Sequence, residues 1–351
     1  MKILFISGRE PAYVRNAMIL KGLRLAGADV LECTDMSGSY PARFLKVLGK
    51  YLVADKSGVD LVFAGFLGQP LVPLIRRLTR KPIVFDAFLS VYDTMCFDRK
   101  RFSPGSAAGR FFFMLDKLSC QGADRVILDT DAHIEYFTRT FGLPEEKFRR
   151  VFVGADDSIF YPREAARDAG RFRVFYYASY LPLHGMEHVV RAAKILERNR
   201  EIEFRIVGSG PRYKIIRELA KNSANVDFVD WVPYEMLPSE IARADVCLGG
   251  HFSDIEKAKR VISGKAYQFI AMKKPVIVGD CPANRELFAD RENALIAKMA
   301  DAASLAEAIL NLRDDAALRG RIAEGGYRTF VERCSPAVIA KELGGIVGAY
   351  R

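Results

Sequence analysis

The sequence predicts an α/β protein built from two doubly wound parallel sheets. Short, nearly continuous apolar runs recur along the chain, as expected of strands that are buried on both faces. Segments with helical periodicity, such as 15–27 and 211–222, separate these runs. This alternation indicates parallel sheets with right-handed crossovers. A length of 351 residues fits about two domains, each able to bury its own core.

The expected strands fall into two groups, separated by a polar segment that contains a proline. We interpret this segment, 161–171, as a linker, and we predict Rossmann-like domains at 1–162 and 171–330, followed by a helix at 331–351. In such sheets ligands bind outside the carboxyl ends of the strands, and two facing domains make a cleft. The expected strands are 2–7, 60–65, 82–87, 125–130, 149–154, 172–179, 203–208, 226–231, 246–250 and 274–280.

Charge and composition restrict the classes of partner and compartment. The formal net charge of +10 favours anionic partners, namely phosphates, nucleic acid or an acidic membrane, but its even spread does not choose among them. No apolar run reaches the roughly 20 residues of a membrane-spanning helix. The N-terminal stretch 1–14 lacks the features of a signal peptide, so we expect a cytoplasmic protein. Six scattered cysteines without a CxxC pair are expected to be free thiols.

A glycine loop lies between a strand and a helix in segment 205–219. Gly208 and Gly210 would let backbone N–H groups approach an anion at the start of the helix. The loop is not a full GxGxxG motif, and no acidic residue follows at the spacing of a dinucleotide fold. A tight strand–helix turn without a ligand is an equally good interpretation.

Two further stretches of the second half suggest contacts with a nucleotide. Lys265 and Gln268 lie one helical turn apart in segment 264–280, where a cation and an amide suit a phosphate beside a ribose. The alternative is an ordinary polar start of a helix. Trp231, next to Val232, comes at the end of an expected strand and could border a base, although packing in the core is at least as plausible.

Metal binding is not expected. The stretch 129–131 reads Asp-Thr-Asp, which matches a metal-binding DxD motif, but three residues are a weak match. Its place between a strand and a helix favours a capping role. His184 and His188 are spaced as HxxxH, but the four histidines, one of which is His133, suggest no metal site.

The helix expected at 40–53 combines a basic stripe with apolar residues. This pattern is typical of a helix that lies on an anionic membrane and of a half-buried surface helix, and the second is the more common. Two more basic segments in the same domain slightly favour the membrane. The stripe consists of Arg43, Lys46 and Lys50, and the further segments are 74–82 and 98–101.

Several ordered stretches together resemble the family-4 retaining glycosyltransferases, which have the GT-B fold. The resemblance covers about residues 150–310, and the N-terminal half matches more loosely. It implies a nucleotide-diphospho-sugar donor on the C-terminal domain and a glycan or lipid-linked acceptor on the N-terminal domain. It also implies transfer with retained configuration, no metal or other cofactor, no nucleic-acid partner, and a C-terminal helix that returns to the first domain. The matching stretches are VGADDSIFYP, PLHGMEHVVRAAKIL, FRIVGSGP, VDFVDWVP, GKAYQFIAMKKPVI and NRELFADRENALI.

The chain departs from the family pattern at charged positions. Many members carry two glutamates separated by seven residues, which fall here at Arg260 and Gln268. The amide of Gln268 can still bond a ribose hydroxyl, as a neutral group. Many members also hold the diphosphate with an arginine and a lysine, whose positions are Ser179 and His184.

We therefore hypothesise that fixed positive charge has moved from one loop to the neighbouring one. Arg260 and Lys265 would hold the diphosphate, and His184 would add an N–H donor whose charge depends on pH. Glu256 would contact the sugar. The alternative is that His184 caps a helix and backbone N–H groups alone bind the phosphates. The remaining donor contacts expected from the resemblance are Gly8, Gly185, Val232 and Gly264.

Catalysis in this family is attributed to attack on the front face of the donor, with a phosphate oxygen taking the acceptor's proton. No nucleophile can be nominated. Gly8 and Arg9 are the candidates on the acceptor side, Asp86 lies near a position where relatives carry a histidine that contacts the donor sugar, and Asp93 is a candidate acceptor contact or base. An anionic membrane is a possible further contact.

Two other function classes stay open. A nicotinamide-dependent oxidoreductase could also have two such domains, but the fingerprint is missing after the first strand. A non-catalytic partner subunit that binds sugar nucleotides is compatible with the altered glutamates. The sequence does not identify the donor base, the sugar or the acceptor.

Overall fold

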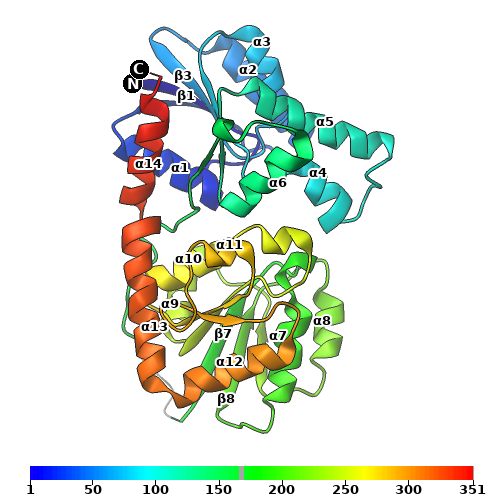
Figure 1. The fold of residues 1–351 in the computed structure, drawn as a ribbon, viewed down its shortest axis with the longest axis vertical. Coiled ribbons are helices and arrows are strands. Elements are labelled where there is room, and N and C mark those ends of the chain that lie inside the picture. Colours follow the sequence, from blue (N-terminus) through cyan, green and yellow to red (C-terminus); the bar gives the residue numbers. More distant parts are fainter. Residues whose placement is uncertain (166–169, 351) are drawn as a thin grey trace. The chain divides into compact units, whose positions relative to one another are not determined.

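Two parallel sheets, each with six strands in the described part of the chain, organise the protein (Figure 1). The computed structural model describes residues 1–165 and 170–350. The chain divides into two units, Met1–Val153 with Pro336–Arg351, and Gly154–Ser335. The prediction of a two-domain, doubly wound α/β fold is therefore confirmed.

The sheet of the first unit has the strand order β2-β1-β3-β4-β5-β6, with every pair parallel. Strand β2 was not predicted, because its sequence DVLEC alternates in polarity and only Cys33 is buried. The strands are β1 (Lys2–Ile6), β2 (Asp29–Cys33), β3 (Val59–Ala64), β4 (Ile83–Asp86), β5 (Arg125–Leu128) and β6 (Phe148–Arg150).

Helices cover this sheet, and one of them comes from the far end of the chain. Helix α14 packs against α1, and both termini lie in this unit (Figure 1). The helices approach closely because Gly22 has no side chain: a Cβ there would lie 2.8 Å from Leu343 Cδ1. The helices are α1 (Val14–Leu25), α2 (Tyr40–Val53), α3 (Val72–Leu78), α4 (Val91–Asp93), α5 (Ala107–Gly122), α6 (Asp131–Phe141) and α14 (Pro336–Gly348).

The sheet of the second unit has the order β12-β11-β10-β7-β8-β9, again all parallel. Strand β12 escaped prediction because it has only three residues. The strands are β7 (Phe172–Tyr177), β8 (Ile202–Val207), β9 (Val226–Val229), β10 (Val246–Gly250), β11 (Val276–Gly279) and β12 (Leu295–Ala297). The helices are α7 (Met186–Ile195), α8 (Tyr213–Leu219), α9 (Leu237–Ala242), α10 (Gly264–Ala271), α11 (Pro282–Arg285), α12 (Ala302–Asp314) and α13 (Ala316–Thr329).

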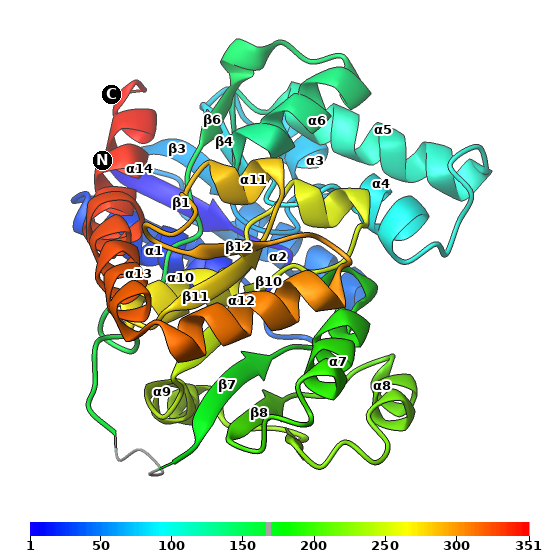
Figure 2. The same ribbon diagram turned by 60° about the horizontal axis from the view of Figure 1, so that its bottom comes forward.

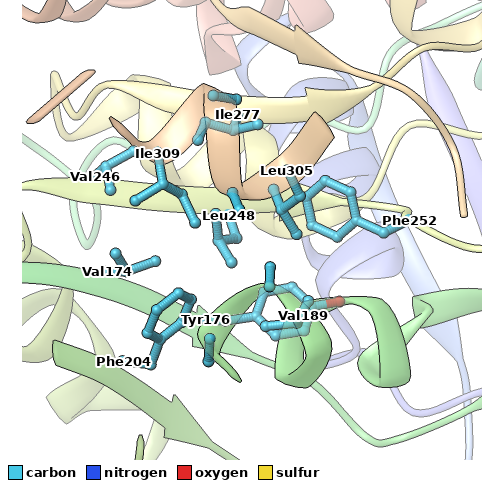
Figure 3. Packing of buried hydrophobic residues seen from close by; sticks show 14 of the residues in the cluster. Val174, Tyr176, Val189, Phe204, Val246, Leu248, Phe252, Ile277, Leu305 and Ile309 are labelled. Atoms are coloured by element: carbon cyan, nitrogen blue, oxygen red, sulfur yellow. The ribbon is translucent and has the colours of Figure 1, made fainter. Parts of the chain in front are cut away.

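The core of the second unit lies between one face of its sheet and helices α7 and α12. These two helices contact each other over β7 (Figure 2). Figure 3 shows Val174, Leu248 and Ile277 of three neighbouring strands facing Leu305 and Ile309 of α12. The central strands are apolar on both faces, as expected where helices cover both faces of a sheet.

The boundary between the units falls after Val153, earlier than the predicted end of the first domain at 162. The physical reason is Phe160, which is fully buried and packs edge-on against Tyr234 of the second unit, with ring centroids 5.5 Å apart. Of the expected linker 161–171, residues 166–169 lie outside the described residues.

All six cysteines are buried free thiols, as predicted. Among the described residues, no helix combines the length and the apolar character needed to cross a bilayer.

Candidate functional site

Two loops of the second unit meet at the carboxyl ends of neighbouring strands. Strand β10 lies beside β7 in the sheet, so the loops that follow them are adjacent. The N–H of Phe252 donates to the carbonyl of His184 at 3.4 Å, and Ser253 Oγ donates to the carbonyl of Leu183 at 2.9 Å. This edge is where doubly wound sheets bind ligands.

Gly185 allows the two loops to come this close. Its φ of +65° lies in the left-handed region, and a Cβ there would lie 2.5 Å from the Phe252 carbonyl carbon. Helix α7 begins at the next residue. A side chain at position 185 would therefore push the β7 loop away from the β10 loop.

Each of the two loops contributes a histidine. The rings of His184 and His251 stack with centroids 5.4 Å apart and an interplanar angle of 11°. The backbone N–H of Leu181 donates to Nδ1 of His184 at 3.3 Å, so Nε2 carries the proton of the neutral ring. His251 is only 5% exposed, and its buried Nδ1 has no hydrogen-bond partner among the residues that the structure describes.

Lys265, at the start of α10, completes the cluster. The side chain is 5% exposed, and Nζ donates to Ser263 Oγ at 2.9 Å. Nζ also lies 5.0 Å and 5.6 Å from the ring centroids of Tyr176 and Tyr177. In the described part of the chain, Lys265 forms no ion pair with a carboxylate.

The electrostatics of this cluster favour a bound anion. Burial lowers the pKa of Lys265 from 10.5 to about 7. Burial also lowers the pKa of His184 and of His251 well below the usual range, and the nearby charge of Lys265 adds to the shift. A buried ammonium without a counter-charge is costly, and an anion placed beside it would offset that cost.

Gln268 lies one turn further along α10 and is held by two tyrosines. Tyr177 Oη donates to Oε1 of Gln268, and Nε2 of Gln268 lies 3.5 Å from Tyr234 Oη. The side chain is buried. The amide is therefore fixed in orientation beside the cluster of His184, His251 and Lys265.

The glycine loop after β8 packs against the β7 loop. At Gly208 and Gly210 a Cβ would lie 2.0 Å and 1.9 Å from the carbonyl oxygens of Ala178 and Ser179. Gly208 also has a φ of +126°, which favours glycine. Close packing alone therefore explains why positions 208 and 210 are glycine, in line with the interpretation of a tight turn. Ser179 itself is exposed.

Trp231 does not pack in the core. Its side chain is 73% exposed, so that interpretation is wrong and a flat aromatic surface is available to a ligand. Val232 beside it is half-buried.

The loop that begins at Glu256 agrees with the hypothesis of relocated charge except at Glu256 itself. The carboxylate of Glu256 is exposed and pairs with Lys259 at 2.6 Å. The turn Glu256–Lys259 contacts the turn Pro182–His184, and the half-buried Arg260 follows it directly. Gly264 has open space around its Cα. The basic loop thus lies next to the histidine loop, as the hypothesis of relocated charge requires.

Asp86 is a correction to the sequence-based candidates. Its carboxylate is completely buried and accepts two hydrogen bonds of 2.9 Å from Arg15, which also donates to the carbonyls of Val151 and Phe152. Burial raises the pKa of Asp86, against the opposing charge of Arg15. Both carboxylate oxygens are engaged, so we do not carry Asp86 forward as a catalytic candidate.

The other candidates of the first unit have mixed surroundings. Asp93 is buried in α4. A Cβ on Gly8 would lie 2.1 Å from the carbonyl oxygen of Leu67, so this glycine is required by packing. Arg9 is partly exposed, pairs with Glu10 at 3.3 Å and lies over the ring of Tyr13.

The Asp-Thr-Asp stretch caps a helix, as predicted. Thr130 Oγ1 accepts from the N–H of His133 at the start of α6, and Asp129 pairs with the His133 ring at 2.9 Å in a buried environment. Among the described residues, no group of three or more histidine, cysteine, aspartate or glutamate side chains could hold a metal ion.

The basic stripe of α2 points to interactions within the first unit. Arg43 is buried and donates to Glu10 at 2.9 Å. Lys46 donates to Ser37 Oγ at 2.8 Å, and Lys50 lies 3.6 Å from Asp35. The interpretation of a half-buried surface helix therefore fits α2, and contact of this stripe with a membrane stays a prediction.

Sequence reasoning missed His251 and the tyrosines that surround Lys265. The sequence contains a signal for His251, because this residue directly follows the expected strand 246–250. The loop of His184 follows the expected strand 172–179 in the same way. Only the strand order shows that these strands, β10 and β7, are neighbours.

Comparison with known proteins finds sequences and structures that are similar to this chain. Residues 171–315 match the family model of glycosyl transferases group 1. The chain is similar to an alpha-D-kanosaminyltransferase of Streptomyces kanamyceticus, with 24% identity over 293 residues, which are 80% of this chain and 70% of that one. The HepE protein of Anabaena in complex with UDP has a TM-score of 0.74 at 16% identity and covers 99% of this chain and 100% of its own.

A second solved structure has the same fold. Sucrose-phosphate synthase of Thermosynechococcus elongatus has a TM-score of 0.76 at 18% identity, covering 99% of this chain and 98% of its own. The likeness of the whole chain to these solved structures shows that the protein has the GT-B fold, and residues 171–315 match glycosyl transferases group 1.

Proposed function

We propose that the protein transfers a sugar from a nucleotide-diphospho-sugar to a glycan or lipid-linked acceptor, with retention of configuration, in the synthesis of surface polysaccharide or glycoconjugates. The observation that carries the proposal is Lys265, a buried ammonium group without a carboxylate partner in the described chain. It lies next to the neutral rings of His184 and His251. A diphosphate is the natural counter-charge for such a cluster.

The surroundings of the cluster suit the rest of a nucleotide. Gln268 offers a fixed amide for a ribose hydroxyl, and exposed Trp231 offers a face for a base. One structural neighbour supports the same donor class, since HepE was solved with UDP and with UDP-glucose. We assign Arg260 to the diphosphate as well, because its loop lies against the loop of His184.

The proposed chemistry needs a stabilised leaving group. The acceptor hydroxyl attacks the anomeric carbon, the bond from that carbon to the diphosphate oxygen breaks, and the proton passes to a diphosphate oxygen. Lys265 and Arg260 stabilise the charge that develops on the diphosphate, which is commonly a large term in catalysis. Fixed cations then take the place of a metal ion, so we propose a reaction without metal in the cytoplasm, at the inner face of the membrane.

A thermal-shift screen of nucleotide sugars tests the donor class. A ligand that binds only the folded state stabilises it by about 2.7 kcal/mol at a hundred times its dissociation constant. We expect a nucleotide sugar to raise the melting temperature, and Lys265→Ala to abolish the rise and to lower turnover by roughly one to three orders of magnitude. Stabilisation by nicotinamide cofactors and not by nucleotide sugars would refute the proposal.

Assays of the product and the metal test the mechanism. We expect the product to keep the anomeric configuration of the donor, and EDTA to leave the rate unchanged. The second candidate is a non-catalytic partner subunit, because Arg260 stands where many family members carry a glutamate. A protein that binds the donor, but neither transfers the sugar nor hydrolyses the donor when no acceptor is present, would favour this candidate.

A further inference from the structure

A surface of the first unit, outside every site described so far, is both apolar and basic. It comprises residues 97–118, which are the segment before α5 and most of α5, and we call it the α5 surface. Five of its large apolar side chains are between 38% and 60% exposed, although most such side chains of a folded protein are buried. They are Phe97, Phe102, Phe111, Met114 and Leu118.

Side chains on α5 form one continuous stripe. Phe111, Met114 and Leu118 are spaced by three and four residues, which places them on the same face of the helix. Phe102 of the preceding loop joins this stripe, because its ring centroid lies 5.7 Å from that of Phe112, which lies 5.4 Å from that of Phe111. Loop and helix therefore expose one apolar surface.

The opposite face of α5 is firmly anchored in the unit. Asp116 is buried and accepts hydrogen bonds from Ser90 Oγ at 2.7 Å and from the N–H of Tyr92 at 2.9 Å. Phe113 packs against Phe141 with ring centroids 5.2 Å apart. The exposed stripe is thus held in place by packing on the other side of the helix.

The charges around the stripe have one sign. In the described part of the chain none of its basic side chains forms an ion pair, and the carboxylates of the segment, Asp98 and Asp116, are both buried. Burial raises the pKa of Asp116 to about 7, which further reduces negative charge here. The basic residues are Arg99, Lys100, Arg101, Arg110 and Lys117.

We infer that the α5 surface docks on an anionic lipid bilayer. Aromatic and aliphatic side chains on one face of a helix, flanked by unpaired arginine and lysine, are the composition that lies in a membrane interface. Helix α2 is the useful contrast, since its basic residues Arg43, Lys46 and Lys50 are engaged within the unit. Docking would bring the enzyme to a lipid-linked acceptor and so rests on the membrane location of the proposed function, but vesicle binding itself requires neither donor nor acceptor.

Sedimentation of the full chain with vesicles tests this inference. We expect binding to phosphatidylcholine vesicles that contain phosphatidylglycerol, and much weaker binding to phosphatidylcholine alone. Each basic side chain near an anionic surface contributes about 1 kcal/mol, or roughly fivefold, so three neutralisations should lower the partition coefficient about a hundredfold. Two phenylalanine replacements should lower it at least roughly tenfold. The two test variants are Arg99→Gln with Arg101→Gln and Arg110→Gln, and Phe102→Ser with Phe111→Ser.

Matched controls use exposed residues elsewhere. Three exposed basic residues of the second unit and two exposed leucines of α2 receive the same substitutions and should leave vesicle binding unchanged. All variants should keep the circular dichroism spectrum and the cooperative thermal unfolding of the wild type, which shows that they fold. The controls are Lys194→Gln with Arg198→Gln and Arg200→Gln, and Leu45→Ser with Leu52→Ser.

Three results would overturn the inference. The first is a wild-type chain that does not sediment with the anionic vesicles. The second is an equal loss of binding in the test and control variants. The third is a concentration-dependent dimer that the phenylalanine variant abolishes, with no vesicle binding, because this would assign the α5 surface to a second copy of the chain.

Discussion

Replacing Lys265 by methionine should make the unliganded protein more stable while it destroys donor binding. Methionine has a similar length and no charge, so it fills the same space. The pKa of Lys265 lies near 7 in the folded protein, about 3.5 units below its ordinary value of 10.5. At 1.36 kcal/mol for each unit, the charged lysine costs the folded state roughly 4–5 kcal/mol at neutral pH.

The sign of the pH dependence follows from proton counting. Between pH 7 and 10.5 the unfolded chain holds this proton and the folded chain does not, so the free energy of unfolding of the wild type rises with pH. The variant lacks this contribution. Its advantage over the wild type should therefore narrow by about 2 kcal/mol from pH 7 to pH 9, measured by urea unfolding of both proteins.

Donor binding should show the complementary effect. Above pH 7 the free lysine loses its proton, and a bound diphosphate must restore it, so the wild-type dissociation constant should rise by up to about tenfold for each pH unit. The variant should bind weakly at every pH. Calorimetry should use a nucleotide sugar, because the terminal phosphate of a nucleoside diphosphate ionises near pH 6 and would add its own slope.

Lys274 provides a matched control. It is also a buried lysine of the second unit, but it donates to the carbonyls of Ala242 and Ala244. Lys274→Met should therefore destabilise the protein, because two carbonyls lose their donor. If Lys265→Met is less stable than the wild type throughout pH 7–9, or keeps the wild-type slope of stability, the reasoning about an uncompensated buried charge is refuted.

Four other variants test single features. His184→Gln keeps a hydrogen-bond donor, so its affinity for the nucleotide sugar should change by less than about fivefold and should keep its dependence on pH. Arg260→Gln removes a permanent charge and should weaken binding of the nucleotide sugar at least tenfold. If the affinity of His184→Gln no longer depends on pH, the histidine is a charged ligand of the diphosphate. Because burial raises the pKa of Asp116 to about 7, wild-type stability should fall by about 2 kcal/mol from pH 5 to pH 7 relative to Asp116→Asn, and a constant difference in urea unfolding would contradict this. Trp231→Ala should change stability by less than about 0.5 kcal/mol, since the side chain is exposed, but weaken donor binding in calorimetry; unchanged affinity would remove it from the site.

The fold was predictable because its central strands are apolar on both faces. The strands that escaped prediction lie at sheet edges: β2 alternates in polarity, and β12 has three residues. Periodicity detects burial, and an edge strand is buried least.

The donor site was predictable in part. Lys265 and His184 were found from local motifs, but His251 joins them only through the neighbouring position of β10 and β7. Asp86 failed for a related reason, because its partner Arg15 is 71 residues away in the sequence. Local patterns indicate which residue types are present, and strand order decides which of them meet.

The origin of α14 has a consequence for biosynthesis. Ile339, Leu343 and Val347 of this helix pack in one apolar cluster with Ile3 and Phe5, so the first unit contains residues from both sides of the second. A ribosome that adds about 5–20 residues per second needs on the order of ten to forty seconds to pass from residue 153 to 336. During that time the second unit is synthesised, and the nascent first unit exposes the face that α14 covers. We therefore expect the first unit to complete its fold only after the second unit has been made, and chaperones to meet the chain on the face of β1 and α1.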